Sequence, residues 1–214
     1  MKRAEIRSLI RNALPRIDKT NRWADMVIDA SCEKVLAQMY EDVWRLSPLN
    51  LQRYVKQFGY TTPVSVSIEA GTGIYYSTLP ESIIPFQDKA SGVRRVSTVA
   101  QGAFTFFPID AREMDLIANG CYFATVNSKI GYAVNQTRIE YYGMTGAVEA
   151  AGVRMDLIIP FSKYAEDDEV KIPEMTDLKT GESFFDRVMK ILQVVQPVDI
   201  KDDNAAQSGN QKDN

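Results

Sequence analysis

The stretch LNLQRYVKQFGYTTPVSVSIEAGTG, residues 49–73, decides the fold, because the spacing of its apolar residues changes within it. Residues 49–58 carry apolar side chains at helical spacing, and Gly59 follows where glycine commonly ends a helix. Residues 63–69 instead alternate apolar and polar side chains, which is typical of a half-buried strand. The change of period predicts a chain with helices before Gly59 and strands after it.

Two further helices are predicted upstream of this stretch. Residues 2–14 form an amphipathic helix that Pro15 stops, with Ile6, Leu9, Ile10 and Leu14 on one face. Asn21 is suited to cap a long helix over about residues 22–46, whose apolar positions recur at helical spacing: Trp23, Met26, Val27, Ala30, Val35, Met39, Val43 and Leu46. This helix is about 37 Å long at 1.5 Å per residue, which is more than one small core requires. We therefore expect it to pack against copies of itself.

A series of short strands is predicted downstream. Gly71-Thr72-Gly73 supplies a hairpin turn, and the strands cover residues 74–77, 82–86, 92–99, 104–108, 121–126, 130–134, 137–142 and 153–160. Strands of this length and spacing are typical of an antiparallel sandwich or barrel. One helix interrupts them, beginning at Asp110 with the capping acid Glu113. A last amphipathic helix covers residues 183–194, and Pro197 stops it.

These elements predict an α+β fold in four parts. Residues 1–60 form an N-terminal helical hairpin or bundle, and residues 61–180 an antiparallel β-sandwich or barrel domain with one inserted helix. Residues 181–197 form a C-terminal helix, and residues 198–214 an extended polar tail with too few apolar side chains to fold alone.

The composition excludes much enzyme chemistry. The 214 residues include no His, so His-based triads, His general bases and His-ligated metals are excluded. Cys32 and Cys121 lack CxxC spacing, which favours apolar packing in a reducing compartment. Helix capping accounts for Asp110 and Glu113, and the acids of residues 166–169 lack EF-hand spacing. We expect a non-enzymatic protein without cofactor or metal and, since no apolar run reaches 18 residues, without a membrane span or signal peptide.

The charges are distributed unevenly along the chain. Residues 1–22 carry seven Lys and Arg against two acids, net +5, and residues 166–214 carry six against twelve, net −6. Opposite ends of this kind suit head-to-tail contact between copies of the chain. A nucleic-acid-binding helix that uses Lys2, Arg3, Arg7 and Arg11 is the alternative, but these cations lack interleaved aromatic residues.

Adjacent aromatic residues recur in the predicted strands, at Tyr75-Tyr76, Phe106-Phe107 and Tyr141-Tyr142. Because side chains alternate between the faces of a strand, one aromatic of each pair must point away from the core. Such strands have two apolar faces, which favours a subunit interface.

Three segments carry a resemblance to a known class of protein. They are ALPRIDKTNRWADMVIDASCEKVLAQMYEDVW at residues 13–44, YVKQFGY at 54–60 and YYSTLPESIIPFQDKASGVRRV at 75–96, followed by an acidic tail. This order resembles the head-to-tail adaptor or connector ring proteins of short-tailed phages, in particular virion proteins of crAss-like and related phages of Bacteroidetes. The resemblance spans about residues 20–195. The β domain is larger than in all-helical adaptors, which leaves open another ring or a tail-tube component of the same virion.

The resemblance implies a function and a set of partners. Such proteins assemble as rings, commonly of twelve copies, that join the portal to the tail and continue the DNA channel. The implied partners are the chain itself, the portal protein, the next tail protein and DNA that passes without sequence specificity, with no membrane. The implied location is the head–tail junction of the virion, after assembly in the host cytoplasm.

The ring interpretation nominates three sets of contact residues. Trp23, Tyr40 and Trp44 are expected to pack against the ring neighbour. Arg94 and Arg95 lie on opposite strand faces, so one of them is expected to face a partner or nucleic acid, although a solvated strand accounts for both. The tail from Asp199 onward, including Asp202 and Asp203, is expected to lie on the portal or on an adjacent subunit. A hydrolase that uses paired carboxylates is a third and less favoured hypothesis for the function.

Overall fold

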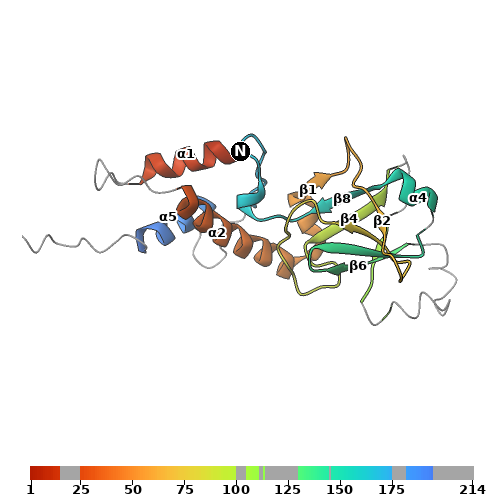
Figure 1. Cartoon of the computed structure of the whole chain (residues 1–214). Helices are drawn as coiled ribbons and strands as arrows, with labels where there is room; N and C mark the ends of the chain where they lie inside the picture. The colour runs from red at the N-terminus through yellow and green to blue at the C-terminus, as the bar shows by residue number, and fades with distance from the viewer. Residues whose placement is uncertain are drawn as a thin grey trace, which may run out of the picture.

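The computed structural model describes residues 1–14, 25–99, 105–110, 113, 130–144, 146–174 and 182–194. Its α-helices are α1 (Arg3–Ala13), α2 (Asp25–Leu46), α4 (Gly146–Ala151) and α5 (Phe184–Val194), with 3-10 helices η1 (Pro48–Tyr54) and η3 (Phe161–Lys163). Helices α1 and α5 lie at one end of the molecule and the strands at the other, with α2 running between them (Figure 1). The predicted α+β class is confirmed.

The described strands form two sheets. The strands β1 (Lys56–Phe58), β8 (Val153–Leu157) and β4 (Val93–Thr98) pair antiparallel in that order. The second sheet has the order β2 (Ser67–Ile68), β3 (Tyr75–Thr78), β7 (Arg138–Tyr142), β6 (Gly131–Asn135) and β5 (Phe107–Pro108), antiparallel except for the pair β5–β6. Phe106 N–H donates to Val96 C=O at 2.8 Å and links the sheets at one edge. The described strands do not close into a barrel.

One continuous hydrophobic core joins the helices to the sheets. Helix α2 contributes the largest share, because an apolar residue falls on its inner face at nearly every turn: Ile28, Cys32, Val35, Leu36, Met39, Tyr40 and Val43 are buried. Ile6 and Ile10 of α1 and Val188 and Leu192 of α5 pack into the same core. Leu9, predicted on the buried face of α1, is half exposed instead.

The predicted helix at residues 49–58 is wrong in its second half. Only Pro48–Tyr54 is helical, as a 3-10 helix, and Lys56–Phe58 is strand β1. Lys56 pairs with Leu157 and Phe58 with Met155 of the buried strand β8, so tertiary pairing overrides the local helical pattern.

Two predicted strands are also corrected. Within residues 63–69 only Ser67–Ile68 is a strand, because Val64 bridges to Val153 of the first sheet while Ser67 pairs with Tyr76 of the second. Residues 82–86 form no strand, and Ile84 makes one backbone hydrogen bond, to Ile158 C=O at 2.9 Å.

Other predictions stand in part or fall outside the described residues. The strands predicted at residues 74–77, 92–99, 130–134, 137–142 and 153–160 correspond to β3, β4, β6, β7 and β8. The strand predicted at residues 104–108 shortens to Phe107–Pro108, and helix α4 was not predicted. The strand at residues 121–126, most of the helix from Asp110 and the polar tail lie outside the described residues.

Candidate interaction surfaces

Helix α1 is fixed to α2 by a nearly buried charge cluster. Asp29 of α2 accepts hydrogen bonds from Arg3 Nη2 and from Arg7 Nε, both at 2.6 Å, and Arg7 Nη2 reaches the same carboxylate. The three side chains are 11–13% exposed. Burial alone would raise the pKa of Asp29, but the hydrogen bonds from Arg7 and Arg3 outweigh it and hold this pKa below its ordinary value. Asp29 is therefore ionised inside the α1–α2 contact, where it holds the two arginines of α1.

The acidic loop at residues 166–169 holds the first turn of α1. Lys2 Nζ lies 3.4 Å from Asp167 Oδ1, and Arg7 pairs with Glu166. The backbone joins in: Arg3 N–H donates to Asp168 C=O at 3.1 Å, and Val170 N–H donates to Met1 C=O at 2.8 Å. The basic and acidic segments that were expected to meet between copies thus meet within one chain.

This arrangement bears on the nucleic-acid alternative. Arg11 also has a partner, because it pairs with Asp25 at the start of α2. All four cations nominated for nucleic acid, Lys2, Arg3, Arg7 and Arg11, therefore already have carboxylate partners. A nucleic acid would have to displace these partners, at a cost in α1 docking.

Tyr40 is a core residue and not a surface contact. Its side chain is fully buried, its hydroxyl donates to Lys171 C=O at 2.8 Å, and its ring packs against Tyr54. The expectation that Tyr40 meets a ring neighbour is therefore wrong, since the inward face of α2 is covered by the chain's own elements. Trp23 lies outside the described residues.

Trp44 and Arg94 are held by the same acid. Trp44 Nε1 donates to Asp88 Oδ2 at 3.1 Å, and Arg94 Nη2 donates to the two Asp88 oxygens at 3.0 and 2.9 Å. The Phe86 ring packs against both, 6.3 Å from the Trp44 ring centroid and 5.3 Å from the Arg94 guanidinium carbon. Arg94 is thus a structural residue and does not face a partner, while half-buried Trp44 keeps one edge accessible.

Arg95 lies on the other face, as the strand pattern predicted. A β-bulge separates Val93 from Arg95, which is exposed opposite Asp156 of β8. Asp199, Asp202 and Asp203 of the predicted tail contact lie outside the described residues.

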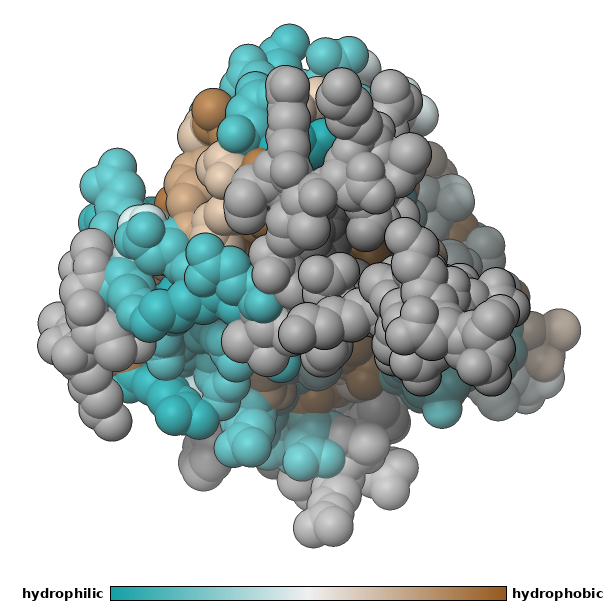
Figure 2. All heavy atoms as spheres, turned by 90° about the vertical axis from the view of Figure 1, so that its left-hand side faces the viewer, coloured by the Kyte–Doolittle hydropathy of each residue, from teal (hydrophilic) through white to brown (hydrophobic). Residues whose placement is uncertain are grey.

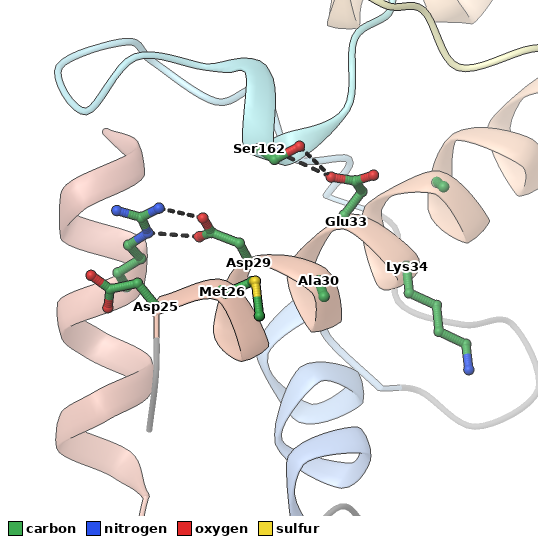
Figure 3. Close-up of a pocket in the computed structure, with 9 residues that line it drawn as sticks. Asp25, Met26, Asp29, Ala30, Glu33, Lys34 and Ser162 are labelled. Atoms are coloured by element: carbon green, nitrogen blue, oxygen red, sulfur yellow. Dashed lines mark hydrogen bonds and ion pairs between the residues drawn. The ribbon is translucent and has the colours of Figure 1, made fainter. Parts of the chain in front are cut away.

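The outward face of α2 lines an open groove. Met26, Ala30, Lys34 and Ala37 line a hollow of about 620 Å³, which Arg7 and Ser162 border (Figure 3). Lys34 and Ala37 also line a second hollow of about 380 Å³, which ends at Trp44 and residues 84–87. The two hollows therefore adjoin the same residues of α2, Lys34 and Ala37.

Met26 is the most exposed large apolar residue of the groove. Met26 is 78% exposed, although its position in the helical spacing of apolar residues had placed it with the core residues. Glu33 is held at the rim, where it accepts a hydrogen bond from Ser162 Oγ at 2.5 Å (Figure 3). Small alanines beside an exposed methionine leave room for a side chain from another subunit.

A second apolar surface lies at the other end of α2. Leu46, the last residue of α2, and Leu49 in η1 are both exposed, Leu49 at 74%. Twenty residues separate Met26 from Leu46, or about 30 Å along the helix. The helical end of the molecule likewise shows apolar surface among hydrophilic side chains (Figure 2).

The sequence missed Asp29 and the placement of Met26. The usable signal for Asp29 was an acid between Ile28 and Cys32, on the face of α2 that the apolar spacing assigns to the core. The sequence contains no such signal for Met26, because its helical spacing is compatible with the buried face of α2 as well as with the exposed one.

Within the described residues, no group of three or more Cys, Asp or Glu is placed to hold a metal ion, and no helix has the length and apolarity needed to cross a membrane. No protein-family model and no curated protein matches the chain.

Proposed function

We propose that this chain is a structural subunit that assembles head to tail with copies of itself, as a ring that joins the portal of a virion to its tail. The observation that carries the proposal is the pair of separate apolar surfaces: the groove at Met26 on α2, and the leucine pair formed by Leu46 at the end of α2 and Leu49 in η1. The phage connector, its usual twelve copies and its DNA channel come from the sequence resemblance alone.

Two separate surfaces suit a heterologous contact. A two-fold dimer uses one self-complementary patch, whereas a ring subunit offers one surface and receives another. The leucine pair projects two aliphatic side chains, and the groove offers Ala30 and Ala37 as a low floor of similar polarity. Leucine side chains of one copy in the groove of the next would remove both surfaces from water.

The charges are consistent with an apolar contact. Asp29 and Asp25 at the groove's end are neutralised by arginines of α1, and Glu33 is bonded to Ser162. A neighbour therefore need not supply a compensating charge for Asp25 or Asp29, which lowers the cost of burying that end of the groove.

Complementary disabled subunits test the head-to-tail contact. Met26→Glu places a negative charge in the apolar groove, and Leu49→Glu places one on the leucine surface. Each variant alone is therefore expected to be monomeric at 24.1 kDa. A one-to-one mixture keeps one intact surface of each kind and should form a heterodimer of twice that mass in light scattering.

The matched control is Ala147→Glu, a similar change at an exposed position of α4 among the strands, which should assemble like the natural chain. A mixture that stays monomeric while the natural chain assembles would exclude contact between these two surfaces. A natural chain that is monomeric at every concentration would exclude self-assembly.

A further inference from the structure

Three cations without carboxylate partners lie near the hydrogen-bonded pair Tyr60 and Asp156. They are Arg95 of β4, Arg154 of β8 and Lys171, which follows the acidic loop. Within the part of the chain that the structure describes, none of the three forms an ion pair, in contrast to the basic residues of α1. We call these three residues and Tyr60 the cationic surface.

The sheet register brings the cationic surface together. Arg95 lies opposite Asp156, and Ser97 lies opposite Arg154, so both arginines stand on the face of the first sheet that points away from Val153 and Met155. The Tyr60 hydroxyl donates to Asp156 Oδ1 at 3.0 Å, and the Arg154 guanidinium carbon lies 5.0 Å from the Tyr60 ring centroid.

The surface is accessible and carries a net positive charge. Arg95 and Lys171 are exposed, Tyr60 is 39% exposed, and Asp156 is buried beneath the tyrosine. Arg95 and Lys171 both lie within electrostatic range of Asp156, while Arg154 lies over the ring of Tyr60, so the three cations outnumber the one acid of this surface. The buried Nε of Arg154 has no hydrogen-bond partner.

We propose that the cationic surface binds the acidic tail segment Asp199-Ile200-Lys201-Asp202-Asp203 of a neighbouring copy. This segment carries three carboxylates and one lysine, so its excess of negative charge complements the excess of positive charge on the surface. The segment carries the positive Lys201 as well as its acids, whereas a DNA phosphate backbone carries no positive group. The pairing is therefore selective for an acidic peptide of mixed charge.

The assignment of the tail to a neighbour rests on the proposed head-to-tail assembly. Lys171 and Phe184 line the same hollow, which places the beginning of α5 near the cationic surface, and α5 runs about 16 Å to Val194. Residues 195–199 span at most about 17 Å. A tail that turned back along its own α5 could bring Asp199 to the beginning of that helix, beside Lys171, so a contact within one chain is the competing arrangement that the isotope experiment tests. Figure 1 also shows α5 at the helical end, away from the sheets.

Carbodiimide cross-linking of the full chain tests the contact directly, because it joins a lysine amine to a carboxylate in salt-bridge contact. We expect Lys171 to be linked to Asp199, Asp202 or Asp203 in digests examined by mass spectrometry. In a mixture of ¹⁴N-labelled and ¹⁵N-labelled chains, the linked peptides should combine the two isotopes. The link between Lys190 and Glu182, which form an ion pair within one chain, is the internal positive control and should not combine them.

A charge reversal on the surface provides the specificity test. Arg95→Glu should lower the yield of the Lys171–tail link by about five- to tenfold, because one exposed attraction becomes a repulsion. Lys163→Glu changes the charge equally at another exposed lysine and should leave the yield unchanged. The Lys190–Glu182 yield reports that both variants are folded.

Three results would overturn the inference. They are the absence of a Lys171–tail link, links confined to one isotope, and a duplex oligonucleotide that is retained by the natural chain but not by Arg95→Glu while no tail link forms. Electron microscopy of the same sample before cross-linking separates this inference from the proposed function. Rings without the link overturn the tail contact alone, and links between copies without rings overturn the ring alone.

Discussion

Replacement of Asp29 by Asn removes one negative charge and almost no volume from the contact between α1 and α2. In the natural chain the Asp29 carboxylate accepts hydrogen bonds from both Arg3 and Arg7. An asparagine keeps one acceptor oxygen and turns an N–H₂ group toward two guanidinium donors. Asp29→Asn therefore leaves two nearly buried arginines with one half-exposed carboxylate, Glu166, between them.

The expected loss of stability follows from this geometry. Removal of one partner from a buried ion pair costs about 3–5 kcal/mol. Glu166 still pairs with Arg7, and Arg3 Nη1 still donates to Tyr164 C=O at 2.5 Å. We therefore expect a loss near the lower limit, about 2–3 kcal/mol, concentrated in the docking of α1.

Urea denaturation followed by tryptophan fluorescence measures the total loss, and hydrogen exchange in residues 1–14 measures the docking of α1. Exchange of these amides should accelerate in Asp29→Asn before the rest of the molecule opens. The control is Glu41→Gln, which breaks the exposed pair with Arg45 and should cost no more than about 0.5 kcal/mol. An Asp29→Asn variant as stable as this control, with α1 still protected, would refute the role given to the charge cluster.

Three further predictions concern pH, a thiol and two glycines. Because the pKa of Asp29 is lowered in the folded state, its contribution is complete above about pH 5 and is lost as pH falls below about 4, which acid titration of the unfolding free energy measures. Burial raises the pKa of Cys32 to about 12, so this thiol should resist alkylation at pH 8 until the chain is unfolded, and mapping the alkylated peptide checks it. Gly59→Ala should destabilise by at least about 2 kcal/mol in urea, because φ is +81° and the new Cβ would lie 2.5 Å from Val153 C=O, whereas Gly146→Ala meets no atom within 4 Å and should be neutral or about 0.5 kcal/mol stabilising.

The elements that the sequence predicted are those whose local pattern agrees with their tertiary burial. Helices α1, α2 and α5 each place an apolar stripe in the shared core, and β8 is buried along its length. The predictions failed at Lys56–Phe58 and at Val64 for one reason: the partners of these residues lie about ninety to one hundred residues away, in β8, beyond the reach of a local pattern. Residues 82–86 contain Pro85, which lacks the N–H that a strand must donate.

The interaction surfaces were less predictable than the fold. The opposite charges of the two chain ends indicated a contact between them. Only the structure shows that Arg7 and Glu166 form an ion pair within one chain. Tyr40 and Met26 share one helical period, yet the first is buried and the second is exposed, because η1, η3 and α5 cover one side of α2 only. Arg95 was nominated with Arg94, and the bulge between Val93 and Arg95 separates their roles.

Negative-stain electron microscopy of the purified full chain is the most direct test of head-to-tail self-assembly. The two apolar surfaces predict closed rings that disappear in both Met26→Glu and Leu49→Glu and persist in Ala147→Glu. Fields that contain only single 24.1 kDa particles at the highest attainable concentration would contradict the account.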